Sequence, residues 1–122
     1  IIERKIVNIV QPDVMYMGGL TRILKLAKLI SKAGYVCTPH AANLSLVTVC
    51  TMHLLKAIPN AGKYLEFSIE GEDYYPWQQD LFSNHPFEIK EGKVIIPDEP
   101  GWGVVINEDW LNSSEYKISE LN

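Results

Sequence analysis

Two side chains that could transfer a proton, Asp13 and His40, each directly follow a proline that ends a short apolar run. The runs cover residues 6–10 and 35–38, and their apolar character is typical of strands buried in a parallel sheet. Proline cannot donate to a strand ladder, so pairing should end at both prolines. Neighbouring strands lie about 4.8 Å apart, which would let the carboxylate hydrogen-bond to the imidazole. Such a pair is the minimal equipment for general acid–base catalysis.

A third ionisable residue, Glu66, lies in a third strand-like run, residues 64–67. Positions 13, 40 and 66 are 27 and 26 residues apart, a spacing typical of successive strand–helix–strand units. Sequential parallel strands joined by right-handed crossovers usually lie side by side. All three side chains should therefore reach one edge of the sheet, the edge at which α/β folds and (β/α)8 barrels form active sites.

Each of these residues also has an ordinary structural explanation. An aspartate before a turn is commonly a cap or turn former, whereas His40 and Glu66 could be exposed polar residues at the rim of a sheet. A zinc site is a weaker alternative, because one histidine with two carboxylates is a poor set of zinc ligands. The near-equal spacing of the three residues favours the functional interpretation.

Two helices are predicted to position these residues. Residues 20–33 carry an apolar stripe opposite a face with three lysines, as expected of a helix on the outside of a sheet. The preceding Gly18-Gly19 pair predicts a tight turn, with a phosphate-binding turn as the weaker alternative. Residues 44–57 are apolar almost all round, which is typical of a helix buried between layers. His53 within it is interpreted as a core histidine hydrogen-bonded to backbone.

The C-terminal part has a different character. Residues 73–86 combine aromatic side chains with polar residues and prolines, which indicates an ordered loop region. Residues 87–90 and 93–96 predict a hairpin around a glycine turn. A short strand over residues 104–106 and a weak helical turn near Asp109 should follow.

Bulk composition limits the classes of partner. At 122 residues and 47% hydrophobic, the chain fits one globular domain. Its net charge of −4 comes from scattered acids without a basic patch, so we expect neither a nucleic-acid nor a membrane partner. No apolar run approaches the roughly 20 residues of a membrane span. Cys37 and Cys50 lie in apolar segments without metal-ligand spacing, and we interpret them as reduced core thiols of a cytoplasmic protein.

Taken together, the motifs resemble the C-terminal part of the catalytic barrel domain in the enolase superfamily, in its mandelate racemase/muconate lactonizing enzyme-like branch. The matching residues stand in the order of that family: Pro12-Asp13, Gly18-Gly19, Pro39-His40, Leu65-Glu66 and the closing run over residues 94–104. The resemblance covers nearly the whole chain.

For the fold, the resemblance implies an α/β structure that is the C-terminal portion of a (β/α)8 TIM-type barrel plus a C-terminal β-hairpin segment. Residues 1–70 would supply strands six to eight with their helices. Residues 71–122 would form a loop and hairpin segment that packs back on the barrel or capping domain. The chain would then be a fragment of a longer, homo-oligomeric enzyme, and we expect it to be inactive alone.

For function, the resemblance implies abstraction of the proton α to a carboxylate in a hydroxy or sugar acid. Asp13 and His40 would act as the acid–base dyad, and Glu66 would contact the substrate carboxylate as the enolate forms. Mg²⁺ would stabilise the enolate, with its ligands expected upstream of this chain. Because His40 could also protonate a leaving hydroxyl, we favour an acid-sugar dehydratase. A racemase or epimerase and a non-catalytic truncated fragment are the alternatives.

One further segment has two open interpretations. The aromatic stretch over residues 74–77 could help to line a pocket for a hydroxylated acid, or it could be a packed surface loop.

Overall fold

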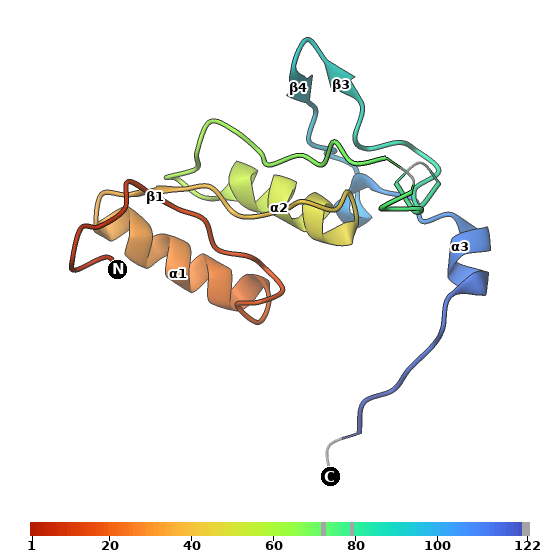
Figure 1. Cartoon of the computed structure of the whole chain (residues 1–122), viewed down its shortest axis with the longest axis horizontal. Coiled ribbons are helices and arrows are strands. Elements are labelled where there is room, and N and C mark those ends of the chain that lie inside the picture. Colours follow the sequence, from red (N-terminus) through yellow and green to blue (C-terminus); the bar gives the residue numbers. More distant parts are fainter. Residues whose placement is uncertain (72, 79, 121–122) are drawn as a thin grey trace.

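The computed structural model is an α/β structure and describes residues 1–71, 73–78 and 80–120 (Figure 1). Its N-terminal half contains a parallel strand pair and two helices: β1 (Ile9–Val10), α1 (Leu20–Lys32), β2 (Val36–Cys37) and α2 (Leu46–Ala57). Its C-terminal half contains an antiparallel ribbon, a 3-10 turn and a short helix: β3 (Ile89–Lys90), β4 (Lys93–Val94), η1 (Gly101–Gly103) and α3 (Glu108–Ser113).

The strands β1 and β2 are shorter than the apolar runs that contain them, and they pair in parallel as Val10 beside Cys37. Pairing does not end at the prolines as predicted. The N–H of His40 donates to the carbonyl of Pro12 at 3.0 Å, and an isolated parallel bridge joins Asp13 to His40. The prediction was wrong because proline lacks only the donor: its carbonyl still accepts a hydrogen bond from the neighbouring chain.

The third strand predicted over residues 64–67 is absent from the described structure, where this stretch forms no ladder. The third parallel contact lies earlier, as an isolated bridge between Cys37 and Ala61. The N–H of Gly62 donates to the carbonyl of Cys37 at 2.8 Å. Glycine is needed there because a Cβ at Gly62 would lie 1.8 Å from Oγ1 of Thr38. The close approach of the backbone at Gly62 to Cys37 and Thr38 therefore determines where the third segment pairs, and the β-forming side chains of residues 64–67 do not.

Helix α1 begins where the sequence predicts. Gly18 and Gly19 adopt φ angles of 84° and 96°, which side chains disfavour, and form the tight turn into the helix. The apolar stripe of α1 is buried through Ile23, Ala27 and Ile30.

Helix α2 begins two residues later than predicted because Ser45 caps it. The Ser45 side chain accepts a hydrogen bond from the N–H of Val47 at 3.2 Å, which favours a helix start at Leu46. The helix buries a broad face, including Val49 and Met52, although it is not covered all round.

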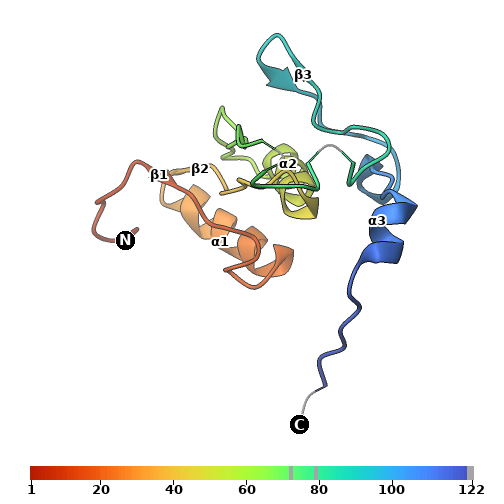
Figure 2. The same cartoon turned by 45° about the vertical axis from the view of Figure 1, so that its right-hand side comes forward.

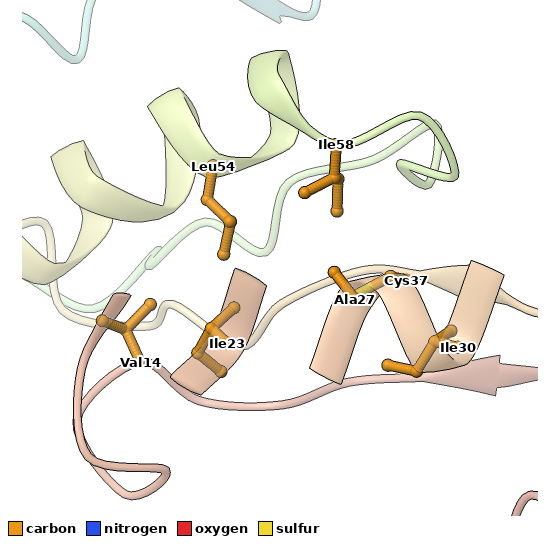
Figure 3. Close-up of a cluster of buried hydrophobic side chains, with 7 residues drawn as sticks. All are labelled: Val14, Ile23, Ala27, Ile30, Cys37, Leu54 and Ile58. Carbon is orange, nitrogen blue, oxygen red and sulfur yellow. The ribbon is translucent and has the colours of Figure 1, made fainter. Parts of the chain in front are cut away.

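The core lies where α1, the parallel strands and the end of α2 meet. Figure 3 shows the side chains that form it: Val14, Ile23, Ala27, Ile30, Cys37, Leu54 and Ile58. Both cysteines are free, with Cys37 buried and Cys50 half-buried. This core fixes the strand ends that carry Asp13 and His40.

The hairpin of β3 and β4 projects away from α1 in both views (Figures 1 and 2). Its paired strands are two residues each, against four in each predicted run. The strand predicted over residues 104–106 is reduced to a single antiparallel bridge between Phe82 and Ile106. Asn107 then caps α3 by accepting from the N–H of Asp109. Within the described residues, no helix combines the length and apolarity that a membrane crossing requires.

Candidate active site

The structure brings Asp13 and His40 into direct contact. Oδ2 of Asp13 lies 2.7 Å from Nδ1 of His40, a distance typical of a charge-assisted hydrogen bond. The two residues come from successive strand ends and are joined by the parallel bridge described above. The carboxylate can only accept, so Nδ1 donates and Nε2 is left to exchange a proton with a ligand.

Asp13 uses its two carboxylate oxygens for different partners. Oδ1 accepts hydrogen bonds from the N–H groups of Met15 at 2.6 Å and Tyr16 at 2.9 Å. Burial raises the pKa of Asp13, but hydrogen bonds from Tyr16, His40 and Met15 and the charge of His40 outweigh it and lower the pKa below its ordinary 3.8. The ionised side chain of Asp13 therefore forms the turn and binds the imidazole of His40 at the same time.

Glu66 approaches the other side of the imidazole. Its Oε2 lies 3.6 Å from Nε2 of His40 and accepts a hydrogen bond from the N–H of Ala41 at 3.2 Å. Glu66 reaches this position from the irregular stretch after the Ala61 bridge, not from the end of a paired strand. The three residues that the sequence selected thus lie together, although the element predicted to hold the third does not form.

Burial differs among the three side chains in a way that suits proton transfer. The side chain of Asp13 is 13% exposed, whereas those of His40 and Glu66 are 42% and 36% exposed. The carboxylate lies behind the imidazole, which opens on a cavity of about 210 Å³. We call this cavity the acid–base pocket; it is lined by Asp13, Met15, Tyr16, His40, Ala41, Ala42, Asn43, Val47 and Tyr75.

Sequence reasoning missed two contributors to this site. The N–H of Ala41 holds Glu66, and a backbone donor leaves no trace in residue type. Tyr16 lines the pocket with an 89% exposed side chain, and only its position three residues after Asp13 could have suggested it.

His53 lies outside the acid–base pocket. Its Nε2 is 3.0 Å from the carbonyl of Trp102, and its ring packs edge-on against that indole. The predicted hydrogen bond to backbone is confirmed, but the predicted core position is wrong, because His53 is only half-buried.

The chain's own residues do not supply a metal centre in the part that the structure describes. Over residues 1–71, 73–78 and 80–120, no three histidine, cysteine, aspartate or glutamate side chains are grouped so that they could hold an ion. Asp13 and Glu66 are committed to an imidazole and to backbone N–H groups. No step is therefore assigned to a metal held by these residues.

The chain as a whole is similar to known proteins. A family model described as enolase C-terminal domain-like matches residues 1–110. A crystal structure of a "putative racemase" from Roseobacter denitrificans has 57% sequence identity and a TM-score of 0.89, covering 98% of this chain and 33% of that one.

Two further relatives extend the comparison. A mandelate racemase/muconate lactonizing protein from Paracoccus denitrificans PD1222, solved in complex with magnesium, is 30% identical with a TM-score of 0.75 over 93% of this chain and 29% of its own. Arabinonate dehydratase from Saccharolobus solfataricus is 27% identical over 117 residues, which are 96% of this chain and 29% of that protein. The chain spans about a third or less of the length of each of these three relatives.

Proposed function

The chain belongs to the enolase C-terminal domain-like family, and on this premise we propose that it carries the acid–base residues of an enzyme that abstracts the proton α to a carboxylate. The observation that carries the proposal is the 2.7 Å bond between Asp13 and His40, with Glu66 on the opposite side of the imidazole. The substrate class is a small hydroxy or sugar acid, as in the arabinonate dehydratase relative.

His40 is the proposed proton carrier. Because Asp13 accepts from Nδ1, the neutral imidazole presents the lone pair of Nε2 to the acid–base pocket. When Nε2 takes the α-proton, the resulting imidazolium lies against the ionised Asp13, which stabilises the positive charge. Asp13 is thus a positioning residue, because it acts through His40 without touching the substrate.

Glu66 is proposed to contact the substrate carboxylate. The N–H of Ala41 fixes Oε2 of Glu66 beside Nε2 of His40. A substrate whose carboxylate lies at Glu66 would therefore have its α-carbon within reach of Nε2. Holding the substrate in a fixed orientation relative to His40 lowers the entropic part of the reaction barrier.

We place dehydration first among the possible outcomes. After the α-proton is removed, His40 donates a proton to the β-hydroxyl, the carbon–oxygen bond breaks with its electron pair leaving on water, and the resulting enol becomes a keto acid. Racemisation is the second candidate, favoured by the 57% identity to the "putative racemase". There His40 keeps the proton it has removed, a second acid expected outside these residues donates a proton to the opposite face of the same carbon, and no bond to oxygen breaks.

The rest of the proposed enzyme lies outside these residues. Residues 1–70 are proposed to be strands six to eight of a (β/α)8 barrel, and residues 71–122 a segment that packs back on the barrel or capping domain. The Mg²⁺ that the Paracoccus relative binds would be held by carboxylates beyond this chain, where it would supply charge stabilisation for the enolate. A homo-oligomer is proposed on the family resemblance, and a cytoplasmic location is supported by the free cysteines.

The proposal can be tested in a graft. In the Roseobacter relative, the third that matches this chain is replaced by these 122 residues; the 57% identity favours correct assembly. We expect the graft to exchange the α-proton of hydroxy acids with solvent deuterium, measured by NMR. The His40→Asn variant, which can still bond to Asp13, should lose about 10²- to 10⁴-fold in this rate.

His85→Ala is the matched control, since it removes an exposed histidine outside the acid–base pocket. It should leave the exchange rate unchanged. Formation of a keto acid by the unsubstituted graft would support the dehydratase, whereas inversion without keto acid would support the racemase. A folded graft that exchanges no α-proton, or one in which His40→Asn is as active as the parent, would overturn the proposal.

A further inference from the structure

A loop distant in sequence from the dyad reaches the acid–base pocket. Tyr75 lines that pocket together with Asp13 and His40, although it lies 35 residues beyond His40. Its side chain is half-buried, and its ring packs edge-on against Tyr74 at a centroid distance of 4.6 Å. Most other lining residues belong to the two stretches that directly follow the strand ends. Tyr75 is therefore the contribution of the C-terminal half to this pocket.

Specific hydrogen bonds hold this loop in place. The indole Nε1 of Trp77 donates to the carbonyl of Asn43 at 2.9 Å. Asn43 is itself fixed, because its side-chain oxygen accepts from the Ser45 hydroxyl at 2.7 Å at the start of α2. The rings of Tyr75 and Trp77 are 5.2 Å apart, so the anchored indole also supports the tyrosine. The loop that carries Tyr75 and the stretch that contains Asn43 are thus both held at the start of α2.

From this placement we propose that Tyr75 contacts the substrate and determines which hydroxylated acids the enzyme accepts. The inference rests on the proposed function and adds to it a specificity residue. Tyr75 offers a flat apolar ring for substrate C–H groups and a hydroxyl that can donate to, and accept from, substrate hydroxyls.

The chemistry of Tyr75 suits a neutral hydrogen-bonding role. Loss of hydration, together with Tyr74 and Glu70 nearby, raises the pKa of Tyr75 above its ordinary 10.0, so its hydroxyl keeps its proton at neutral pH. A neutral phenol beside the dyad can bind a hydroxyl without competing for the α-proton, which leaves proton transfer to His40.

The test compares two substitutions in the graft with a matched control. Tyr75→Phe removes only the hydroxyl, and Tyr75→Ala also removes the ring. Tyr74→Phe makes the same change on the adjacent residue, which is 68% exposed and does not line the pocket. The kcat/KM values are measured on hydroxy acids of three to six carbons, and the affinity for tartrate is measured by calorimetry.

We expect Tyr75→Phe to lower kcat/KM on the preferred acid by about five- to tenfold, the effect of one lost hydrogen bond. Tyr75→Ala should shift the preference toward longer acids, because the pocket widens. Tyr74→Phe should change neither. Equal losses on every acid, or the same effect from Tyr74→Phe, would overturn the inference and indicate a purely structural role.

Failure of the proposed function would look different. If the graft binds tartrate but exchanges no α-proton, the acid–base proposal fails while the Tyr75 inference is still decided by calorimetry. A tartrate affinity that Tyr75→Phe leaves unchanged would then count against Tyr75, and a weaker affinity in that variant alone would support it.

Discussion

The two halves of this chain are stabilised in different ways. Of the twelve buried hydrophobic residues in the part that the structure describes, eleven lie before residue 60 and only Phe82 lies after it. The N-terminal half packs α1 and α2 against parallel strands. Exposed apolar side chains occur in both halves, such as Tyr16 at 89% in the first and Ile95 and Leu111 at 69% and 63% in the second. A half without its own core must be held by contacts with other parts.

Hydrogen bonds and an ion pair join the two halves. His53 bonds to the carbonyl of Trp102, and Lys56 pairs with Asp98 at 2.7 Å, so α2 holds the turn around η1. Trp77 anchors the loop that carries Tyr75. The residues proposed for acid–base chemistry therefore follow strands that belong to the core, whereas the residue proposed for specificity, Tyr75, lies on an attached loop. Such a loop can change in sequence with little cost to the core.

The largest expected effect comes from removing a core side chain in the N-terminal half. Ile23 is fully buried, so Ile23→Ala should lower the opening free energy of α1 by about 2–5 kcal/mol through lost burial and the cavity left behind. Leu111→Ala, in α3, should cost less than about 0.5 kcal/mol. Hydrogen exchange of the graft, followed peptide by peptide, measures both. Similar losses at the two positions would contradict the division into a packed half and an attached half.

A second, smaller effect should come from the third parallel contact, where Ala61 and Gly62 approach Cys37 and Thr38. In Gly62→Ala, the new methyl group would meet Oγ1 of Thr38 at 1.8 Å, so the segment must move away from β2 at a cost of about 1–3 kcal/mol. The matched control is Gly71→Ala, since nothing lies within 4 Å of a Cβ there. Urea denaturation of the graft gives both values.

The double variant Gly62→Ala/Thr38→Ala sharpens this prediction. Removing Oγ1 of Thr38 should recover part of the loss, and the non-additivity measures the contact directly. If Gly62→Ala is as well tolerated as Gly71→Ala, close backbone approach does not set the third strand position.

The sequence predicted the two helices and the dyad because both depend on local patterns. The apolar stripe before Gly34 and the glycine pair at 18–19 define α1 without knowledge of the rest of the chain. The apolar runs before Asp13 and His40 predict two strands, and two successive parallel strands have few ways to pair. Short-range signals therefore carried these predictions.

Other features depend on contacts that residue type does not encode. The third strand was predicted over residues 64–67 from its aromatic and apolar side chains, but the contact forms around Ala61, where Gly62 allows the backbone to approach. Glu66 nevertheless reaches His40, because it follows the Ala61 bridge by only five residues and the N–H of Ala41 donates to its carboxylate. The position of Tyr75 is likewise tertiary, since it requires the bond from Trp77 to Asn43.

The smallest expected effect concerns Asp13, where core and site meet. The pKa of Asp13 in the folded chain lies below the ordinary 3.8, so its ionised form stabilises the fold at pH values above about 3.8. That contribution is lost as pH falls through the lowered folded pKa. In Asp13→Asn, an amide replaces the charge-assisted acceptor of His40, and the variant should be less stable than the parent by about 1 kcal/mol near neutral pH.

The pH dependence of that difference identifies its origin. Urea denaturation of the graft between about pH 5 and pH 3 should show a gap between parent and Asp13→Asn that shrinks as pH falls below the ordinary 3.8, where Asp13 loses its charge and with it the interaction with His40. Asp73→Asn, which changes an exposed aspartate in the C-terminal half, should show no such gap. A gap that persists unchanged at the acid end would mean that Asp13 stabilises the chain through the shape of its turn and not through its charge. The contact between Asp13 and His40 would then follow from the shape of the turn alone. The core would still position the two residues, but the charge of Asp13 would play no part in it.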